Sequence, residues 1–170
     1  MDQLAKSKPT ATIAMRDWGM LAAFIAICLA AGGIGARLTD TAVKTWFRTL
    51  QRPPLAPPDW VFGPVWTTLY LMMAVAAWLV WRRRHTFDVR IALTLFAVQL
   101  VLNVAWSGLF FYLQNPAAAL VDIVALEATL IATAIAFRRV DGKAAALLLP
   151  YVAWVAFATY LNAGFWWLNR

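Results

Sequence analysis

Residues 61–81 read VFGPVWTTLYLMMAVAAWLVW, and Arg82-Arg83-Arg84 follow this uncharged stretch directly. An apolar run of about 20 residues crosses the hydrocarbon core of a bilayer as an α-helix, and an adjacent arginine cluster is typical of the cytoplasmic end. Similar runs lie on both sides of this stretch, separated by charged residues or proline. The expected membrane spans are 18–38, 61–81, 91–113, 117–137 and 144–168.

The composition of the whole chain agrees with this assignment. Of its 170 residues, 63% are hydrophobic and 14% are charged, and ten are tryptophans, which serve as interfacial anchors or as walls of aromatic pockets. A soluble core of this size could not bury so much apolar surface. We therefore expect an all-α membrane protein: an N-terminal tail, 1–17, and one domain, 18–168, built as a bundle of five transmembrane helices.

The links between spans predict how the helices are arranged. Only Gln114-Asn115-Pro116 separate the third and fourth spans, so these two helices should be antiparallel neighbours. Residues 39–60 form the one long connection, which is rich in proline. A loop of this length in a compact fold is more often functional than idle.

The distribution of positive charge predicts the orientation in the membrane. Ten of the 15 Lys and Arg residues lie in the tail and in the loops after the second and fourth spans. This bias places the N-terminus in the cytoplasm and the C-terminus and the long loop outside, as in a bacterial inner membrane. Because the basic residues cluster at span ends and not on one face of a soluble domain, the net charge of +7 does not indicate nucleic acid.

The first span could also be interpreted as a secretory signal peptide. Its apolar run is longer than the usual h-region of about 7–15 residues, so we expect a mature helix. Gly32, Gly33, Gly35 and Ala36 would then allow close approach of a neighbouring helix. Cys28, the single cysteine, lies in this span and is interpreted as packing.

Polar residues within spans are costly in lipid and should face the bundle interior. Gln99, Asn103 and Trp106 fall at i, i+4 and i+7, so they share one helix face. They could line a binding site, or they could only hydrogen-bond neighbouring helices. A second stripe on one helix face consists of Trp154, Ala158 and Leu161, with Phe157 beside it. The small Ala158 between large side chains could leave room for a flat ligand, or the stripe could be ordinary helix packing.

The remaining candidates offer little conventional catalysis. Asp122 and Glu127 are five residues apart, so they do not share one helix face as an acid–base pair would. His85 follows three arginines and has no partner ligands in the sequence, which disfavours a metal role. Phosphate loops and nucleophile motifs are absent from the sequence, and no catalytic residue is assigned.

Several motifs, in order along the chain, resemble those of one known family. They are LQRPPLAPPDWVFGPVWTTLY (50–70), QLVLNVAW (99–106) with Phe110-Phe111, ALVD (119–122), and PYVAW (150–154) with Leu161-Asn162. Together they resemble the tryptophan-rich sensory protein (TspO/MBR) family, which includes the mitochondrial translocator protein, or peripheral benzodiazepine receptor. The resemblance covers nearly all of residues 18–168.

The resemblance implies a five-helix bundle, often a homodimer, with a pocket under the first loop. Such a pocket binds porphyrins such as protoporphyrin IX and haem as ligands, with no obligatory cofactor, and also sterols and synthetic isoquinoline or benzodiazepine compounds. A tetrapyrrole suits indole walls, amide donors, and Lys or Arg at the mouth. By motif, the lid would be Trp46, Pro57, Pro58 and Trp60, and the lining would be Ala36, Phe62, Gly63, Trp66, Asn103, Trp106, Trp154, Phe157, Ala158 and Leu161.

Three positions depart from the family pattern. Leu55 stands where the family commonly has tryptophan, which implies a looser pocket roof. Ala118 stands where mammalian members have a tryptophan, so the resemblance alone does not imply affinity for their drugs. Ala163 replaces the tyrosine of the animal cholesterol-recognition segment, which argues against high-affinity sterol binding.

The sequence thus favours a membrane protein that senses, sequesters or translocates porphyrins and so regulates tetrapyrrole metabolism or stress signalling. One alternative is light- and oxygen-dependent breakdown of porphyrin, with reactivity drawn from the bound pigment. Another is a small-molecule transporter, which charged residues lining a continuous path would favour, but the sequence has few of them.

Overall fold

The computed structural model describes residues 11–170, and it is all-helical. All five long helices are long and apolar enough to span a membrane, which confirms the predicted fold class. Residues 1–10 of the predicted tail lie outside the described part, whereas residues 11–17 already belong to the first helix. The helices are α1 (Ala11–Lys44), α2 (Phe62–Arg82), α3 (Arg90–Ser107), α4 (Pro116–Val140) and α5 (Gly142–Leu168).

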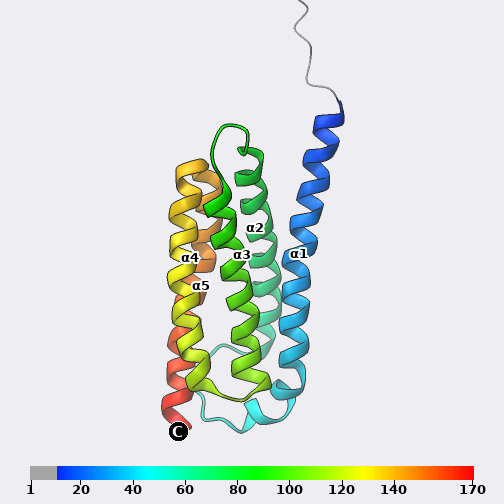
Figure 1. Cartoon of the computed structure of the whole chain (residues 1–170). Coiled ribbons are helices and arrows are strands. Elements are labelled where there is room, and N and C mark those ends of the chain that lie inside the picture. Colours follow the sequence, from blue (N-terminus) through cyan, green and yellow to red (C-terminus); the bar gives the residue numbers. More distant parts are fainter. Residues whose placement is uncertain (1–10) are drawn as a thin grey trace, which may run out of the picture.

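The helices run alternately up and down and form one bundle (Figure 1). Contacts between them give the order α1, α2, α5, α4, α3, with α3 returning to α1. The α2–α3 and α4–α5 loops lie at one end, here called the inner end, and α1 extends beyond the other helices there (Figure 1). The long α1–α2 connection, the α3–α4 link and the C-terminus lie at the opposite, outer end.

The first helix is longer than the sequence predicted, which corrects the expected boundary at 38 and shortens the expected loop 39–60. Helix α1 continues to Lys44, and the connection then contains two single turns, η1 (Trp46–Thr49) and η2 (Asp59–Val61). The extension is polar but well supported, because Lys44 Nζ lies 2.6 Å from Asp40 Oδ1 at i, i+4. Hydropathy marks where the membrane ends, and this helix continues beyond that point.

The third helix ends in a widened turn. Residues Gly108–Tyr112 form a π-helical turn, η3, directly after α3. Gln114 then takes φ 50°, which stops the helix, and Asn115 Oδ1 caps α4 by accepting a hydrogen bond of 3.0 Å from the backbone N–H of Ala118. The result is the close antiparallel pairing of α3 and α4 that the three-residue link predicted.

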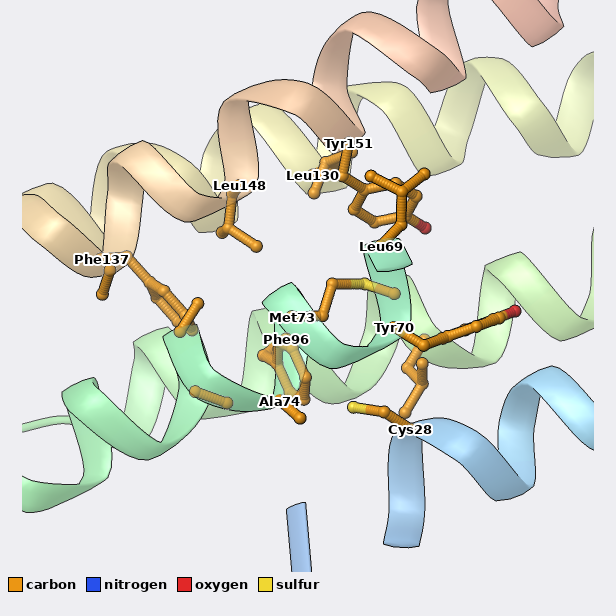
Figure 2. Close-up of a cluster of buried hydrophobic side chains, with 14 of the residues drawn as sticks. Cys28, Leu69, Tyr70, Met73, Ala74, Phe96, Leu130, Phe137, Leu148 and Tyr151 are labelled. Atoms are coloured by element: carbon orange, nitrogen blue, oxygen red, sulfur yellow. The ribbon is translucent and has the colours of Figure 1, made fainter. Parts of the chain in front are cut away.

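Large buried side chains fill the bundle from its inner end to its middle (Figure 2). Met73, Phe137 and Leu148 are fully buried there, and Cys28 packs against the same cluster, as predicted. Ala74, with Ala76 and Ala77 in the same cluster, is also fully buried, so small residues bring α2 close to its neighbours. The helices are therefore closely packed around this apolar cluster.

The α1–α2 connection is tied to the last turns of α5. The Tyr160 hydroxyl donates a hydrogen bond of 3.0 Å to the backbone carbonyl of Pro54. The Asn169 side chain accepts from the backbone N–H of Gln51 at 2.8 Å and donates to its carbonyl at 3.1 Å. A Cβ on Gly164 would lie 2.6 Å from Cβ of Pro53, so only glycine allows this contact. These contacts hold the connection on α5.

Candidate functional site

A cavity of about 540 Å³ lies in the outer half of the bundle. Helices α1, α2, α3 and α5, the η3 turn, and residues of the α1–α2 connection contribute to its wall. This volume falls within the range of about 300–1,000 Å³ that is typical of small-molecule sites. The lining comprises Leu29, Gly32, Gly33, Gly35, Ala36, Thr39, Asp40, Val43, Phe47, Asp59, Phe62, Gly63, Trp66, Thr67, Tyr70, Asn103, Trp106, Ser107, Phe110, Phe111, Ala158, Leu161, Asn162 and Phe165.

Aromatic rings form much of the wall. Trp106 lies against Phe110, with ring centroids 5.6 Å apart and an interplanar angle of 33°. Phe47, from the connection, packs against Phe110 and Phe165 at 6.3 and 5.0 Å and is itself buried. These contacts hold the rings against one another, so this part of the wall is apolar and well packed.

One part of the wall is polar. Asn103, only 2% exposed, accepts a hydrogen bond of 2.5 Å from the Tyr70 hydroxyl at Oδ1. Its Nδ2 donates to the Tyr151 hydroxyl at 2.8 Å. Because these residues come from α3, α2 and α5, the network joins three helices. It also places hydroxyl and amide groups at the edge of an apolar cavity, where they are costly unless paired.

A second polar contact fixes an indole of the wall. Trp106 Nε1 donates 2.9 Å to Oδ1 of Asn162, whose Nδ2 donates 2.7 Å to the backbone carbonyl of Pro116. Asn162 therefore connects α3, α5 and the first residue of α4. The Trp106 ring has one satisfied N–H and a fixed orientation toward the cavity.

The cavity opens sideways between α1 and α2. Lining residues that are also exposed form one stripe on α1, where they recur at helical spacing, and a second stripe on η2 and α2. Gly33 and Gly63 have no heavy atom within 4 Å of an added Cβ, so this slot is unobstructed there. The stripes are Leu29, Gly33, Ala36 and Asp40 on the first, and Asp59, Gly63 and Thr67 on the second.

The structure gathers eight of the fourteen sequence-predicted residues around this cavity. Ala36 lies on α1, and the others come from α2, α3 and α5, as the motifs implied. That they contact a ligand remains a prediction. The eight are Ala36, Phe62, Gly63, Trp66, Asn103, Trp106, Ala158 and Leu161.

The other six predicted residues lie outside the lining. Trp154 packs edge-on against Phe62, with ring centroids 5.9 Å apart, and Phe157 lies beside it at 5.8 Å, so both stand behind the wall. Trp46 packs against Phe110 at 5.9 Å, and Trp60 is 75% exposed and is not part of the lining. Pro57 and Pro58 are likewise absent from the lining, so the predicted lid residues do not themselves contact the cavity.

Several lining residues were not predicted from the sequence. Gly32 and Asp40 lie on α1 at i−4 and i+4 from Ala36, so helical spacing from that residue could have identified them. Phe47 and Phe165 come from separate parts of the chain and meet through tertiary packing. No sequence signal places those two rings together.

The remaining polar candidates lie away from this site. Gln99 is fully buried, and its Nε2 lies 3.8 Å from the Met73 sulfur, so it contacts a neighbouring helix and not the cavity. Asp122 and Glu127 on α4 each have one buried carboxylate oxygen with no hydrogen-bond partner among the described residues. His85 is exposed in the α2–α3 loop.

Comparison with known proteins shows extensive similarity. Residues 24–168 match the model of the TspO/MBR family. The chain is 44% identical over 146 residues to the Tryptophan-rich protein TspO of Chlorobaculum tepidum, and this aligned region covers 84% of this chain and 90% of that protein. It is 40% identical over 141 residues to the Translocator protein of Bos taurus, covering 82% and 83%, respectively. Identity to the Tryptophan-rich sensory protein of Cereibacter sphaeroides is 35% over 146 residues, covering 86% and 89%.

Proposed function

Since this chain belongs to the TspO/MBR family, we propose that it binds tetrapyrroles, porphyrin or haem, in the cavity between its transmembrane helices. The observation that carries this proposal is the cavity itself, about 540 Å³ in volume and walled by Trp66, Trp106 and Phe110. Rigid aromatic walls favour a flat apolar molecule over a flexible one, because stacking is retained across the whole disc.

The polar groups at the cavity suit the same class of ligand. Asn103 lines the cavity, and its amide N–H that is not bonded to Tyr151 can donate to an acceptor on the ligand. The slot between α1 and α2 is unobstructed at Gly33 and Gly63, so a flat molecule dissolved in the bilayer could pass through it edge-on. Binding would then precede sensing, sequestration or translocation of the ligand, and so regulation of tetrapyrrole metabolism or stress signalling.

The proposed setting is a membrane in which the inner end of the bundle faces the cytoplasm. Arg82 ends α2 there and is followed by Arg83 and Arg84, and Arg138 and Arg139 lie in the last turn of α4, as expected for the cytoplasmic side. The cavity would then open near the outer surface and into the bilayer. A homodimer is part of the proposal, on the strength of the family resemblance alone.

Light- and oxygen-dependent breakdown of porphyrin is a second candidate, favoured by two indoles that line the cavity. Trp66 and Trp106 would both lie beside a bound pigment, where each could donate an electron to it and so be oxidised. The pigment supplies the photochemistry, and the chain supplies binding and orientation. On this account, Trp66→Phe or Trp106→Phe lowers the rate of pigment loss under illumination more than it lowers affinity. Equal loss of pigment in these variants and in wild type would exclude a role for these two indoles in the breakdown.

The main proposal is tested by titrating the full-length protein in detergent with protoporphyrin IX and measuring the quenching of its tryptophan fluorescence. We expect saturation at a fixed stoichiometry, and competition by haem. Empty micelles with free tryptophan derivative provide the control for partitioning of the pigment into detergent. Quenching that rises linearly without saturation, as in that control, would contradict the proposal.

A further inference from the structure

The charged groups at the cavity form ion pairs at its outer rim. Asp40, on the last turns of α1, and Asp59, at the start of η2, are the charged residues of its lining. Each is paired with a base that does not itself line the cavity: Asp40 with Lys44 at 2.6 Å and Asp59 with Arg52 at 2.6 Å. The outer rim of the cavity therefore carries two preformed ion pairs.

Arg52 is held in a defined position at this rim. Its Nη2 donates a hydrogen bond of 2.6 Å to Oδ1 of Asp59, and its guanidinium carbon lies 5.4 Å from the centre of the Phe47 ring. Phe47 is buried and lines the cavity, so the guanidinium packs on a wall residue beside Asp59, which also lines the cavity. Two contacts from different parts of the connection thus restrict a side chain that would otherwise move freely.

The guanidinium keeps donors free for another acceptor. An arginine side chain has five N–H donors in a planar fork, and the bond to Asp59 uses one of them. The planar fork matches a carboxylate, and charge-assisted bonds of this kind are roughly twice as strong as neutral ones. Lys44 similarly has three N–H donors, of which the bond to Asp40 uses one.

We propose that Arg52, assisted by Lys44, recognises the carboxylates of a flat ligand at the rim of the cavity, and that Asp59 positions Arg52 while weakening its pull on anions. This inference rests on the proposed function and assigns its specificity: a tetrapyrrole with free carboxylates is preferred over its neutral ester. The apolar disc lies against the aromatic wall, and its charged edge lies at the ion pairs, where water screens it only partly.

The two members of the Arg52–Asp59 pair have opposite expected effects. Replacing Arg52 with Gln removes the cation and should weaken binding of the dicarboxylate alone. Replacing Asp59 with Asn leaves an oxygen that still accepts from Arg52 Nη2, but it removes a negative charge from the lining. The second change should therefore strengthen dicarboxylate binding. A cluster with only a structural role would not produce changes of opposite sign.

The experiment compares protoporphyrin IX with its dimethyl ester, each titrated into the full-length protein in one detergent. The readout is the ratio of the two dissociation constants, each taken relative to wild type, so that partitioning of the pigments into detergent cancels. The variants are Arg52→Gln, Asp59→Asn and Lys44→Gln. Arg48→Gln is the matched control, because Arg48 is an exposed cation of the same connection that neither lines the cavity nor joins these ion pairs.

We expect Arg52→Gln to weaken binding of the diacid by about three- to tenfold. This factor is smaller than for a buried ion pair, because the Arg52 side chain is 39% exposed and water screens its charge. Lys44→Gln should act in the same direction but less, since its side chain is 64% exposed. Asp59→Asn should tighten diacid binding, and the ester should bind all these variants as it binds wild type.

Several results would overturn the assignment. An unchanged ratio in Arg52→Gln would exclude Arg52 as the recognition group, while saturable ester binding would leave the proposed function standing. An equal effect of Arg48→Gln would show that only the general positive charge of this end matters. Failure of both pigments to saturate wild type would refute the proposed function and the inference together.

Discussion

The indole N–H of Trp106 donates a hydrogen bond of 2.9 Å to the side-chain oxygen of Asn162, and this bond joins α3 to α5 at the wall of the cavity. Asn162 is 1% exposed, and its amide also reaches the carbonyl of Pro116. One side chain therefore fixes a cavity tryptophan and secures the start of α4. The integrity of the site and the stability of the outer half of the bundle are coupled through this residue.

Asn162→Ala should destabilise the protein by about 1–2 kcal/mol, because it leaves the partly buried Trp106 N–H without its acceptor and removes the side-chain bond to the Pro116 carbonyl. The apparent thermal unfolding midpoint in detergent measures this effect. Thr68→Ala is the control, since the hydroxyl of Thr68 is exposed and bonds only to its own helix. An equal midpoint for Asn162→Ala and wild type would show that the indole is fixed by packing alone.

Two adjacent glycines of α1 should respond in opposite ways to the same substitution. A Cβ on Gly32 would lie 2.6 Å from the Tyr70 ring, so Gly32→Ala should displace Tyr70, weaken its bond to Asn103 and lower the thermal midpoint. A Cβ on Gly33 would have no heavy atom within 4 Å, so Gly33→Ala should keep or raise the midpoint. Alanine is favoured over glycine inside a helix by about 1 kcal/mol. Equal changes in both variants would contradict the contact between α1 and Tyr70.

The attachment of the α1–α2 connection to α5 can be tested by hydrogen exchange. Asn169→Ala removes both hydrogen bonds between α5 and the backbone of Gln51. Peptides covering residues 46–61 should then exchange faster than in wild type, with no change in the α2–α3 loop. Arg170→Ala, next in the chain and in contact with the Trp167 ring only, is the control and should leave exchange as it was. Exchange in Asn169→Ala as slow as in wild type would mean that the contacts of Gly164 and Tyr160 are enough to hold the connection on α5.

The proposed orientation predicts which loops a membrane-impermeant thiol reagent can reach. In a Cys28→Ala background, Leu55→Cys places a thiol in the α1–α2 connection, where Leu55 is 80% exposed. Thr86→Cys places one in the exposed α2–α3 loop. Intact cells should label at position 55 and should label at position 86 only after lysis. The reverse pattern would show that the arginine clusters do not set the orientation in the proposed way.

The fold was predictable because membrane spans are a property of local sequence. Runs such as 61–81 can be recognised without tertiary information, and the Gln114-Asn115-Pro116 link left α3 and α4 no arrangement but an antiparallel hairpin. The end of α1 was not predictable from hydropathy, since the residues up to Lys44 are mostly polar yet helical. There the Asp40–Lys44 pair supports a helix that has left the apolar region.

The candidate site was only partly predictable, for a related reason. Motif and spacing correctly brought Asn103 and Trp106 to the cavity, because residues three apart share a helix face. Spacing also grouped Trp154 with Ala158, but only Ala158 lines the cavity, since a large ring can turn aside and pack on Phe62. The position of Trp60 depends on the course of an irregular segment, which has no periodicity from which to predict it.

The proposed binding site is the cavity between the helices, and a substitution at Ala158 can close part of it. Ala158 is 7% exposed and lines the cavity from α5, whereas Ala156 on the same helix is exposed and lines nothing. Protoporphyrin IX should bind Ala158→Leu at least about tenfold more weakly than wild type, because the added methyl groups occupy ligand space, whereas Ala156→Leu should bind as wild type does. Equal affinity in Ala158→Leu and Ala156→Leu would place the pigment outside the cavity and contradict the account.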